Sequence, residues 1–234
     1  MMKNPQGICL FFLSIFFLAA PGKEVGAQEI VTADRYMEIV AERYGSIRDY
    51  EAQITIRSGN SDMAGNLSFL DPSFMRIDFT NPAEQVICFN GEQLTVYIPE
   101  FRVTLNQEIS SRSSASTDAS LASAQGLGLL RRNYVPSFVS GPEPVPLDER
   151  STEMVVKIRL TRRSASENYR EIILSINPET RLIRRMEGRT VADALVRFDF
   201  ANIRTNLGIP PARFIYVAPS TANMVNNFLF RDRD

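Results

Sequence analysis

The feature of this sequence that most limits its fold is a long series of short segments in which apolar and polar residues alternate. Two segments show the alternation most clearly: YEAQITIR puts Tyr50, Ala52, Ile54 and Ile56 on one face, and FMRIDF does the same for Met75, Ile77 and Phe79. Turn-forming pairs such as Asp71-Pro72 and Asn81-Pro82 separate the segments. Because the connections are short, we expect an antiparallel meander from Tyr50 to Gln107.

The same pattern returns in the second half of the chain. The segments EMVVKIRL, YREIILSI, RLIRRMEG, ALVRFDFANIRTN and RFIYVAP all read as strands. Both halves together predict a mainly β protein with about 10–11 strands and two or three short helices. A sheet of that size must curl, close or split to protect its edges and bury one face.

One clear helix precedes the first strand, in the segment TADRYMEIVAERYGSI. Thr32 is a favourable N-cap, and Gly45 is a natural stop. The apolar residues between them recur at helical spacing: Tyr36, Met37, Val40, Ala41 and Tyr44. We expect this stripe to pack against the sheet.

The segment AEQVICFNGEQLTVYIPE (Ala83–Glu100) reads as a hairpin with Asn90-Gly91 in the turn. A two-residue turn would place Ile87, Phe89, Leu94, Val96 and Ile98 on one face, and Val86, Cys88, Thr95 and Tyr97 on the other. Both faces are at least half apolar, whereas a sheet with one solvated face should alternate apolar with polar residues. Apolar material is therefore expected on both sides of this hairpin. The sequence leaves open which face lines a cavity.

The middle of the chain differs in kind from the strands around it. Residues 110–120 (SSRSSASTDAS) are small and polar, and LASAQGLGLLRR follows as an apolar, glycine-containing segment that predicts a short or broken helix. An apolar segment that interrupts a β-meander is a candidate lid, and we place this lid at about residues 110–131. The alternative is a surface loop whose leucines cap the core.

The N-terminus has the layout of a secretory signal. One lysine precedes the apolar run ICLFFLSIFFLAA, and small residues follow it, with Val25-Gly26-Ala27 as the expected cleavage motif. We therefore predict a signal peptide over residues 1–27, a single domain over residues 28–234, and a periplasmic location. The apolar run is shorter than the ~20 residues of a spanning helix, which makes a membrane anchor the weaker alternative.

The residues that usually carry catalysis are scarce. The chain has no histidine, which removes Ser-His-Asp and Cys-His machinery and the commonest zinc sites. Cys88, the only cysteine after the signal peptide, lies in an apolar strand and reads as a buried structural thiol. Asp78, near Arg76, reads as a structural ion pair rather than a general base. We predict a non-enzymatic protein with no metal and no cofactor.

The formal net charge is only −1, which argues against nucleic-acid binding. Residues 157–189 nevertheless hold nine basic and four acidic residues. These can be ordinary solvated strand faces or a docking surface for a charged partner.

Several motifs occur in an order that resembles a known family. They are YxAxITI, GNLSFLDPSFMRIDF, NPAEQVICFNGEQLTVYIP and FDFANIRTNLGIPPARFIYVAP, behind an N-terminal helix and a signal peptide. This order resembles the periplasmic outer-membrane lipoprotein carrier (LolA-like) family, from Val31 to about Pro219. The resemblance implies a half-open β-barrel, a single curved antiparallel sheet with an N-terminal helix and a short helical lid over an apolar cavity.

The resemblance also implies a function and partners. Such proteins accept the acyl chains of lipoproteins from an inner-membrane ATP-driven transporter and pass them to an outer-membrane acceptor. Two alternatives remain: a periplasmic lipid- or lipoprotein-sensing regulatory module and, with less support, a periplasmic hydrolase.

Candidate acyl-binding residues follow from the alternation and the resemblance together. Those expected in the cavity or at its entrance are Leu67, Phe69, Met75, Ile77, Phe79, Ile87, Phe89, Leu94, Val96, Ile98, Leu121, Leu127 and Leu130. Asp71 and Arg76 are expected at the rim or in contact with the lid. Well-known members of the family carry an arginine directly before the proline that matches Pro72. In this chain that position is Asp71, which cannot donate the same hydrogen bonds.

Overall fold

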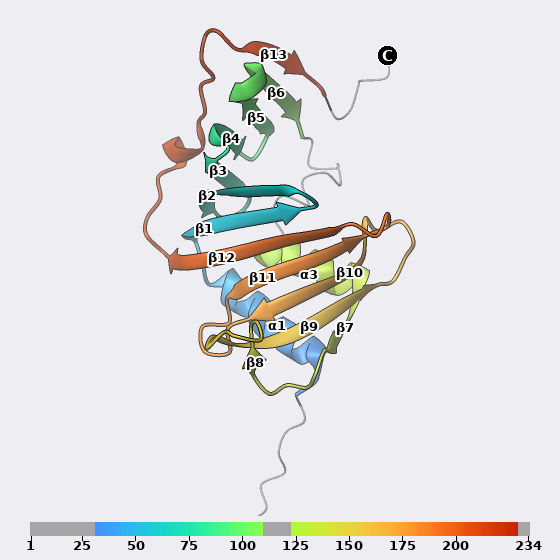
Figure 1. Cartoon of the computed structure of the whole chain (residues 1–234). Coiled ribbons are helices and arrows are strands. Elements are labelled where there is room, and N and C mark those ends of the chain that lie inside the picture. The colour runs from blue at the N-terminus through green and yellow to red at the C-terminus, as the bar shows by residue number, and fades with distance from the viewer. Residues whose placement is uncertain (1–30, 110–122, 229–234) are drawn as a thin grey trace, which may run out of the picture. The chain divides into compact units, whose positions relative to one another are not determined.

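Strand β1 (Asp49–Ser58) lies near the middle of one large sheet, in the order β13-β6-β5-β4-β3-β2-β1-β12-β11-β10-β9-β7 (Figure 1). The computed structural model describes residues 31–109 and 123–228. Neighbouring strands are antiparallel except for β13 and β6, and β8 pairs with β9 beside the main path. The sheet is curved and open, which confirms the predicted half-open architecture.

The described strands number thirteen. The first six are β1, β2 (Ser61–Leu70), β3 (Phe74–Asn81), β4 (Ala83–Phe89), β5 (Gln93–Ile98) and β6 (Val103–Glu108). The others are β7 (Tyr134–Phe138), β8 (Val145–Pro146), β9 (Met154–Arg162), β10 (Tyr169–Ile176), β11 (Ile183–Thr190), β12 (Leu195–Thr205) and β13 (Asn223–Asn226). The predicted number was 10–11, and the difference comes from β7, β8 and β13, which are too short to show a clear alternation.

Helix α1 (Ala33–Gly45) forms where the sequence predicts it. The Thr32 side chain accepts a hydrogen bond from the Arg35 backbone N–H, which satisfies one of the free amides of the first turn. The stripe of Tyr36, Met37, Val40 and Tyr44 is buried, so the amphipathic face packs into the core.

Helix α3 (Ala124–Asn133) is a short, unbroken helix of ten residues, the first of the two forms expected from the sequence. Ser123 caps it by accepting from the Gly126 N–H at 3.0 Å, and Leu127 and Leu130 are buried. The burial of these leucines offsets the low helix propensity of Gly126 and Gly128. Within the described residues, neither helix has the length and hydropathy needed to cross a membrane.

Both helices pack on the same face of the sheet, which we call the inner face (Figure 1). One apolar cluster joins Met37 and Val40 of α1 and Leu127 of α3 to the inward side chains of strands β1–β4 and β9–β12. Ile158, Leu160, Leu174 and Ile176 have no exposed surface, and they form the centre of this core.

The chain after β12 crosses the other, outer face of the sheet. Residues 207–222, which we call the strap, include the short 3-10 helix η2 (Pro211–Phe214) and lead into the edge strand β13. The prediction that RFIYVAP forms a strand is therefore wrong. Its alternation is real, because Phe214 is buried and Ile215 exposed, but it arises from packing on the outer face instead of pairing in the sheet.

A second 3-10 helix, η1 (Pro99–Phe101), joins β5 to β6. The predicted signal peptide lies outside the described residues, as do residues 110–122 of the predicted lid segment.

Candidate apolar binding face

The β4–β5 hairpin keeps the predicted side-chain grouping with a different turn. Phe89 pairs with Leu94, so the connection between these paired positions has four residues, and the Asn90 N–H closes it by donating to the carbonyl of Gln93, the first residue of β5, at 3.2 Å. Since the turn is longer by two residues than predicted, every side chain stays on its predicted face. The set containing Ile87 and Phe89 faces inward, and the set containing Cys88 faces the strap.

Seven residues in direct register form a row across seven adjacent strands of the inner face. We call this set the apolar row: Ala52, Leu67, Ile77, Ile87, Val96, Leu105 and Val225. Its members are buried on β1, β2 and β3, half-buried on β4, β5 and β6, and exposed on β13, where Val225 is 44% exposed. The row therefore runs out of the protein core onto an accessible apolar surface.

The residues predicted to bind acyl chains divide into two groups along this gradient. Leu67, Phe69, Met75, Ile77, Phe79, Phe89, Leu127 and Leu130 are buried within the core cluster. Ile87, Leu94, Val96 and Ile98 are half-buried on the inner face. Leu121 lies outside the described residues.

Strands β6 and β13 add apolar residues to this face that were not among the predicted acyl-binding residues. Val103 and Leu105 are half-buried partners of Ile98 and Val96. The alternation of apolar and polar residues in FRVTLNQ could have predicted that these two residues share the inner face. No sequence pattern indicated Val225, because all four residues of β13 are exposed and the strand is defined only by its parallel pairing with β6.

The outer face of the hairpin is covered by the strap. Val86, Cys88 and Tyr97 form a second buried cluster with Phe214, which is 1% exposed. The Cys88 thiol donates to the Phe214 carbonyl at 3.1 Å, and burial raises the pKa of this thiol. A raised pKa keeps Cys88 protonated and poorly nucleophilic, as expected of a structural cysteine.

Arg76 and Asp78 anchor the strap to strand β3. The Arg76 guanidinium donates to both Asp78 carboxylate oxygens and to the Arg213 carbonyl at 3.1 Å, and Arg213 itself donates to Asp78. Arg76 also lies 5.5 Å from the ring centroid of Tyr216. Arg76, predicted at the rim or lid, thus lies on the outer face and holds the strap.

The start of the strap is fixed by a buried carboxylate. Asp49, 4% exposed, accepts hydrogen bonds from the backbone N–H groups of Leu207 at 2.6 Å and Gly208 at 3.1 Å. Asp71, the other residue predicted at the rim, is exposed in the turn between β2 and β3, and its backbone N–H donates to the Arg48 carbonyl at 2.7 Å.

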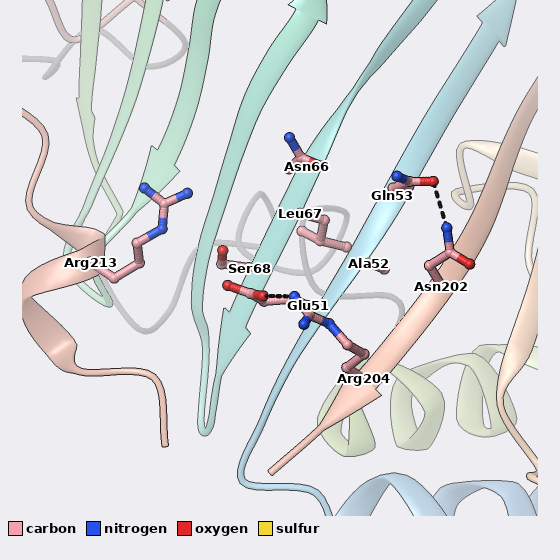
Figure 2. A pocket seen from close by; sticks show the side chains of 9 residues that line it. All are labelled: Glu51, Ala52, Gln53, Asn66, Leu67, Ser68, Asn202, Arg204 and Arg213. Carbon is pink, nitrogen blue, oxygen red and sulfur yellow. Dashed lines mark hydrogen bonds and ion pairs between the residues drawn. The ribbon is translucent and has the colours of Figure 1, made fainter. Parts of the chain in front are cut away.

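A polar groove of about 430 Å³ opens on the outer face over β1, β2 and β12 (Figure 2). Asn202 donates to Gln53 at 2.8 Å and Arg204 donates to Glu51 at 2.7 Å, both across β1 and β12. Asn66, Ser68 and Arg213 line the same groove. Ala52 and Leu67 also contribute, but most of the lining is polar, so the apolar row on the inner face is the better candidate for a lipid.

The potential metal ligands in the described part of the chain are its acidic side chains and its cysteine. Among residues 31–109 and 123–228, no three His, Cys, Asp or Glu side chains are grouped as metal ligands. Asp78 is occupied by two arginines, in the structural role that the sequence suggested.

Comparison with solved structures relates this architecture to other proteins, whereas no family model and no curated sequence matches the chain. An uncharacterized conserved protein from Thermus thermophilus superposes with a TM-score of 0.52 at 10% identity, over 81% of this chain and 98% of that one. MucB superposes with a TM-score of 0.50 at 15% identity, over 80% of this chain. The chain shares its fold with MucB.

The match spans 63% of the MucB chain, and MucB from Pseudomonas aeruginosa has also been solved in complex with MucA. The similar structures include a LolA superfamily protein from Nitrosomonas europaea, with a TM-score of 0.38 at 14% identity, over 80% of this chain and 98% of that one. At these identities the likeness to MucB and to the Thermus protein concerns the fold.

Proposed function

We propose that this protein is a periplasmic carrier that binds the acyl chains of lipoproteins on its inner face and shuttles them from the inner to the outer membrane. The observation that carries the proposal is the apolar row, which leaves the core at β4 and continues to an exposed edge at β13. A row that only served packing would end in polar residues where the core ends.

The dimensions of the accessible part suit a hydrocarbon chain. From Ile87 to Val225 the row crosses three strand-to-strand spacings of ~4.8 Å each, or about 14 Å. Each methylene group that leaves water on such a surface contributes about 0.8 kcal/mol. Several contacts along one acyl chain can therefore give strong binding without any specific polar group.

The position of the strap supports placing the acyl-binding site on the inner face of the sheet. Because it covers Val86, Cys88 and Tyr97, the outer face of the hairpin is already packed, and the inner face is the one with apolar surface to offer. The accessible surface would thus comprise Ile87, Leu94, Val96, Ile98, Val103, Leu105 and Val225.

The proposed activity is binding and transfer, without catalysis or a cofactor. An inner-membrane ATP-driven lipoprotein-releasing transporter as donor, and an outer-membrane acceptor, are part of the same proposal. The signal-peptide pattern of residues 1–27 supports the periplasmic location.

A second candidate is a sensing module that binds a lipid or lipoprotein and signals through a protein partner. The shared fold with MucB, which has been solved with MucA, favours this candidate. Both candidates use the same apolar face, and they differ in what the loaded protein contacts next.

The experiment that tests the proposal compares a lipoprotein with and without its acyl chains. The purified protein should capture the acylated form in a soluble complex and leave the deacylated form unbound. Equal capture of the two forms, or no capture, would exclude an acyl-chain carrier and direct attention to protein partners.

A further inference from the structure

Six arginines in the described part of the chain make no side-chain hydrogen bond or ion pair with other described residues, and three of them gather at one place. The six are Arg48, Arg102, Arg132, Arg150, Arg162 and Arg163. Arg132 lies in the last turn of α3, Arg162 ends β9, and Arg163 begins the following loop. Most other arginines of the sheet are paired with carboxylates, so this grouping needs an explanation of its own.

Backbone contacts place the main chains of these three arginines side by side. The Arg163 N–H donates to the carbonyl of Asn133 at 2.8 Å, and Arg162 is the register partner of Tyr134. Arg132 directly precedes Asn133, so the three guanidinium groups come from adjoining backbone positions on α3 and β9. Arg132 and Arg163 are exposed, and Arg162 is half-exposed.

Two exposed aliphatic side chains lie at the same end of the sheet. Val191 and Leu195 flank the β11–β12 turn and are 47% and 48% exposed. The Val191 N–H donates to the Asn168 carbonyl at 3.2 Å, and Arg170 donates to the Val191 carbonyl at 2.6 Å. The loop after β9 therefore joins this turn to the arginines, and Figure 1 shows the two connections side by side at the ends of their strands.

Acidic residues nearby do not cancel the positive charge. Asp34 pairs with Arg131 and Asp193 pairs with Arg189, so each of these acids already has a basic partner. Among the described residues, Glu167 of the β9–β10 loop lies close to Arg163, since its N–H donates to the Ser164 carbonyl at 3.4 Å, and it has no basic partner. The corner keeps a positive excess with apolar side chains beside it.

We propose that this basic corner, formed by Arg132, Arg162 and Arg163 with Val191 and Leu195, docks the protein on a membrane surface that carries anionic phospholipids. Guanidinium groups bind phosphate oxygens with paired hydrogen bonds, and exposed aliphatic tips can enter the headgroup region. The inference rests on the proposed function for its purpose, because a carrier of acyl chains must meet a membrane. The corner itself is separate from the apolar row.

The test is cosedimentation of the protein, purified from the periplasmic fraction, with vesicles of phosphatidylcholine alone or mixed with phosphatidylglycerol. The key variant is the double substitution Arg132→Gln and Arg163→Gln. Its matched control is Arg48→Gln with Arg150→Gln, which removes the same charge from exposed arginines at the opposite end of the strands that also lack a partner among the described residues. Using whole protein without lipoprotein keeps the result independent of acyl binding.

We expect binding to the anionic vesicles, weak binding to the neutral ones, and a loss of roughly 25-fold in the key variant, because each arginine near an anionic surface contributes about fivefold. The control double variant should bind like the original protein. Absence of vesicle binding, equal binding to both vesicle types, or equal losses in the two double variants would overturn the proposal. An acidic protein as the true partner would appear as the first of these outcomes. Failure here with intact acyl capture would leave the carrier function standing.

Discussion

The guanidinium of Arg76 and the carboxylate of Asp78, two residues apart on one strand, form a two-pronged ion pair with Nε–Oδ1 and Nη2–Oδ1 distances of 3.0 and 2.8 Å. The same carboxylate receives Arg213 from the strap, 135 residues later in the chain. One acidic side chain on β3 therefore holds together the sheet and the segment that covers its outer face.

Replacing Asp78 with Asn should loosen the strap, because it leaves two arginines without their shared carboxylate. The side chains are partly exposed, so we expect a loss of about 1–2 kcal/mol in the free energy of unfolding. Urea unfolding measures the loss, and hydrogen exchange should show faster exchange in residues 207–222. Asp193→Asn, which breaks an exposed pair with Arg189, is the control and should cost less than ~0.5 kcal/mol.

Phe214 should be the main apolar anchor of the strap. The substitution Phe214→Ala empties a site that is 1% exposed, and we expect it to cost about 3–5 kcal/mol. Ile215→Ala, at the next residue but 66% exposed, should change the free energy of unfolding by less than ~0.5 kcal/mol. Similar urea midpoints for the two variants would show that the strap does not pack on the hairpin.

Substitutions at buried residues of the predicted acyl site should lower the free energy of unfolding much more than substitutions at its half-buried residues. Phe69 is buried and stacks on Tyr50 with ring centroids 5.1 Å apart, so Phe69→Ala should cost about 3–5 kcal/mol. Val96 is half-buried, and Val96→Ala should cost about 1 kcal/mol or less. A large loss at Val96 would mean that this position belongs to the core instead of an accessible face.

Stability should fall at alkaline pH because of buried tyrosines. Burial raises the pKa of Tyr44 to about 12, and it also raises the pKa of Tyr50 well above the ordinary value of 10. Below pH 10 both states keep these phenols neutral. Between pH 10 and about 12 the unfolded chain ionises first, so the free energy of unfolding falls as pH rises, by about 2–3 kcal/mol for Tyr44 alone.

Urea unfolding at a series of pH values from 8 to 12 measures this decline. In the Tyr44→Phe variant the decline should be shallower, since one of the groups with a raised pKa is gone. That variant also loses the hydroxyl that accepts from the Ile183 N–H at 3.1 Å, which should lower its stability at every pH. An equal slope in both proteins would contradict the assignment to Tyr44.

Local patterns predicted the strands and their faces well. Tyr50, Ala52, Ile54 and Ile56 are all buried as the alternation required, and Thr32 caps α1 as expected. The grouping of Ile87 with Val96 was correct even though the turn was not, because a turn longer by two residues preserves which side each residue faces.

The sequence could not decide which hairpin face would be covered, because the answer depends on Phe214, which follows Cys88 by 126 residues. Residues 213–219 of the strap were predicted to form a strand, since packing on the outer face of the sheet produces the same alternation as pairing within it. Strand β13 left no pattern at all, because its residues are exposed and only backbone pairing with β6 defines it. Such long-range contacts position the candidate site, and local periodicity does not report them.

The most direct test of the central claim uses two glutamate substitutions on neighbouring strands, Leu105→Glu and Met224→Glu. Leu105 is in the apolar row of the inner face, whereas Met224 pairs with Thr104 on the outer face and is 65% exposed. Circular dichroism confirms folding before capture of an acylated lipoprotein is measured. We expect Leu105→Glu to weaken capture roughly tenfold or more, because an acyl chain would bury an unpaired charge, and Met224→Glu to bind normally. Equal capture by the two variants would contradict an acyl site on the inner face.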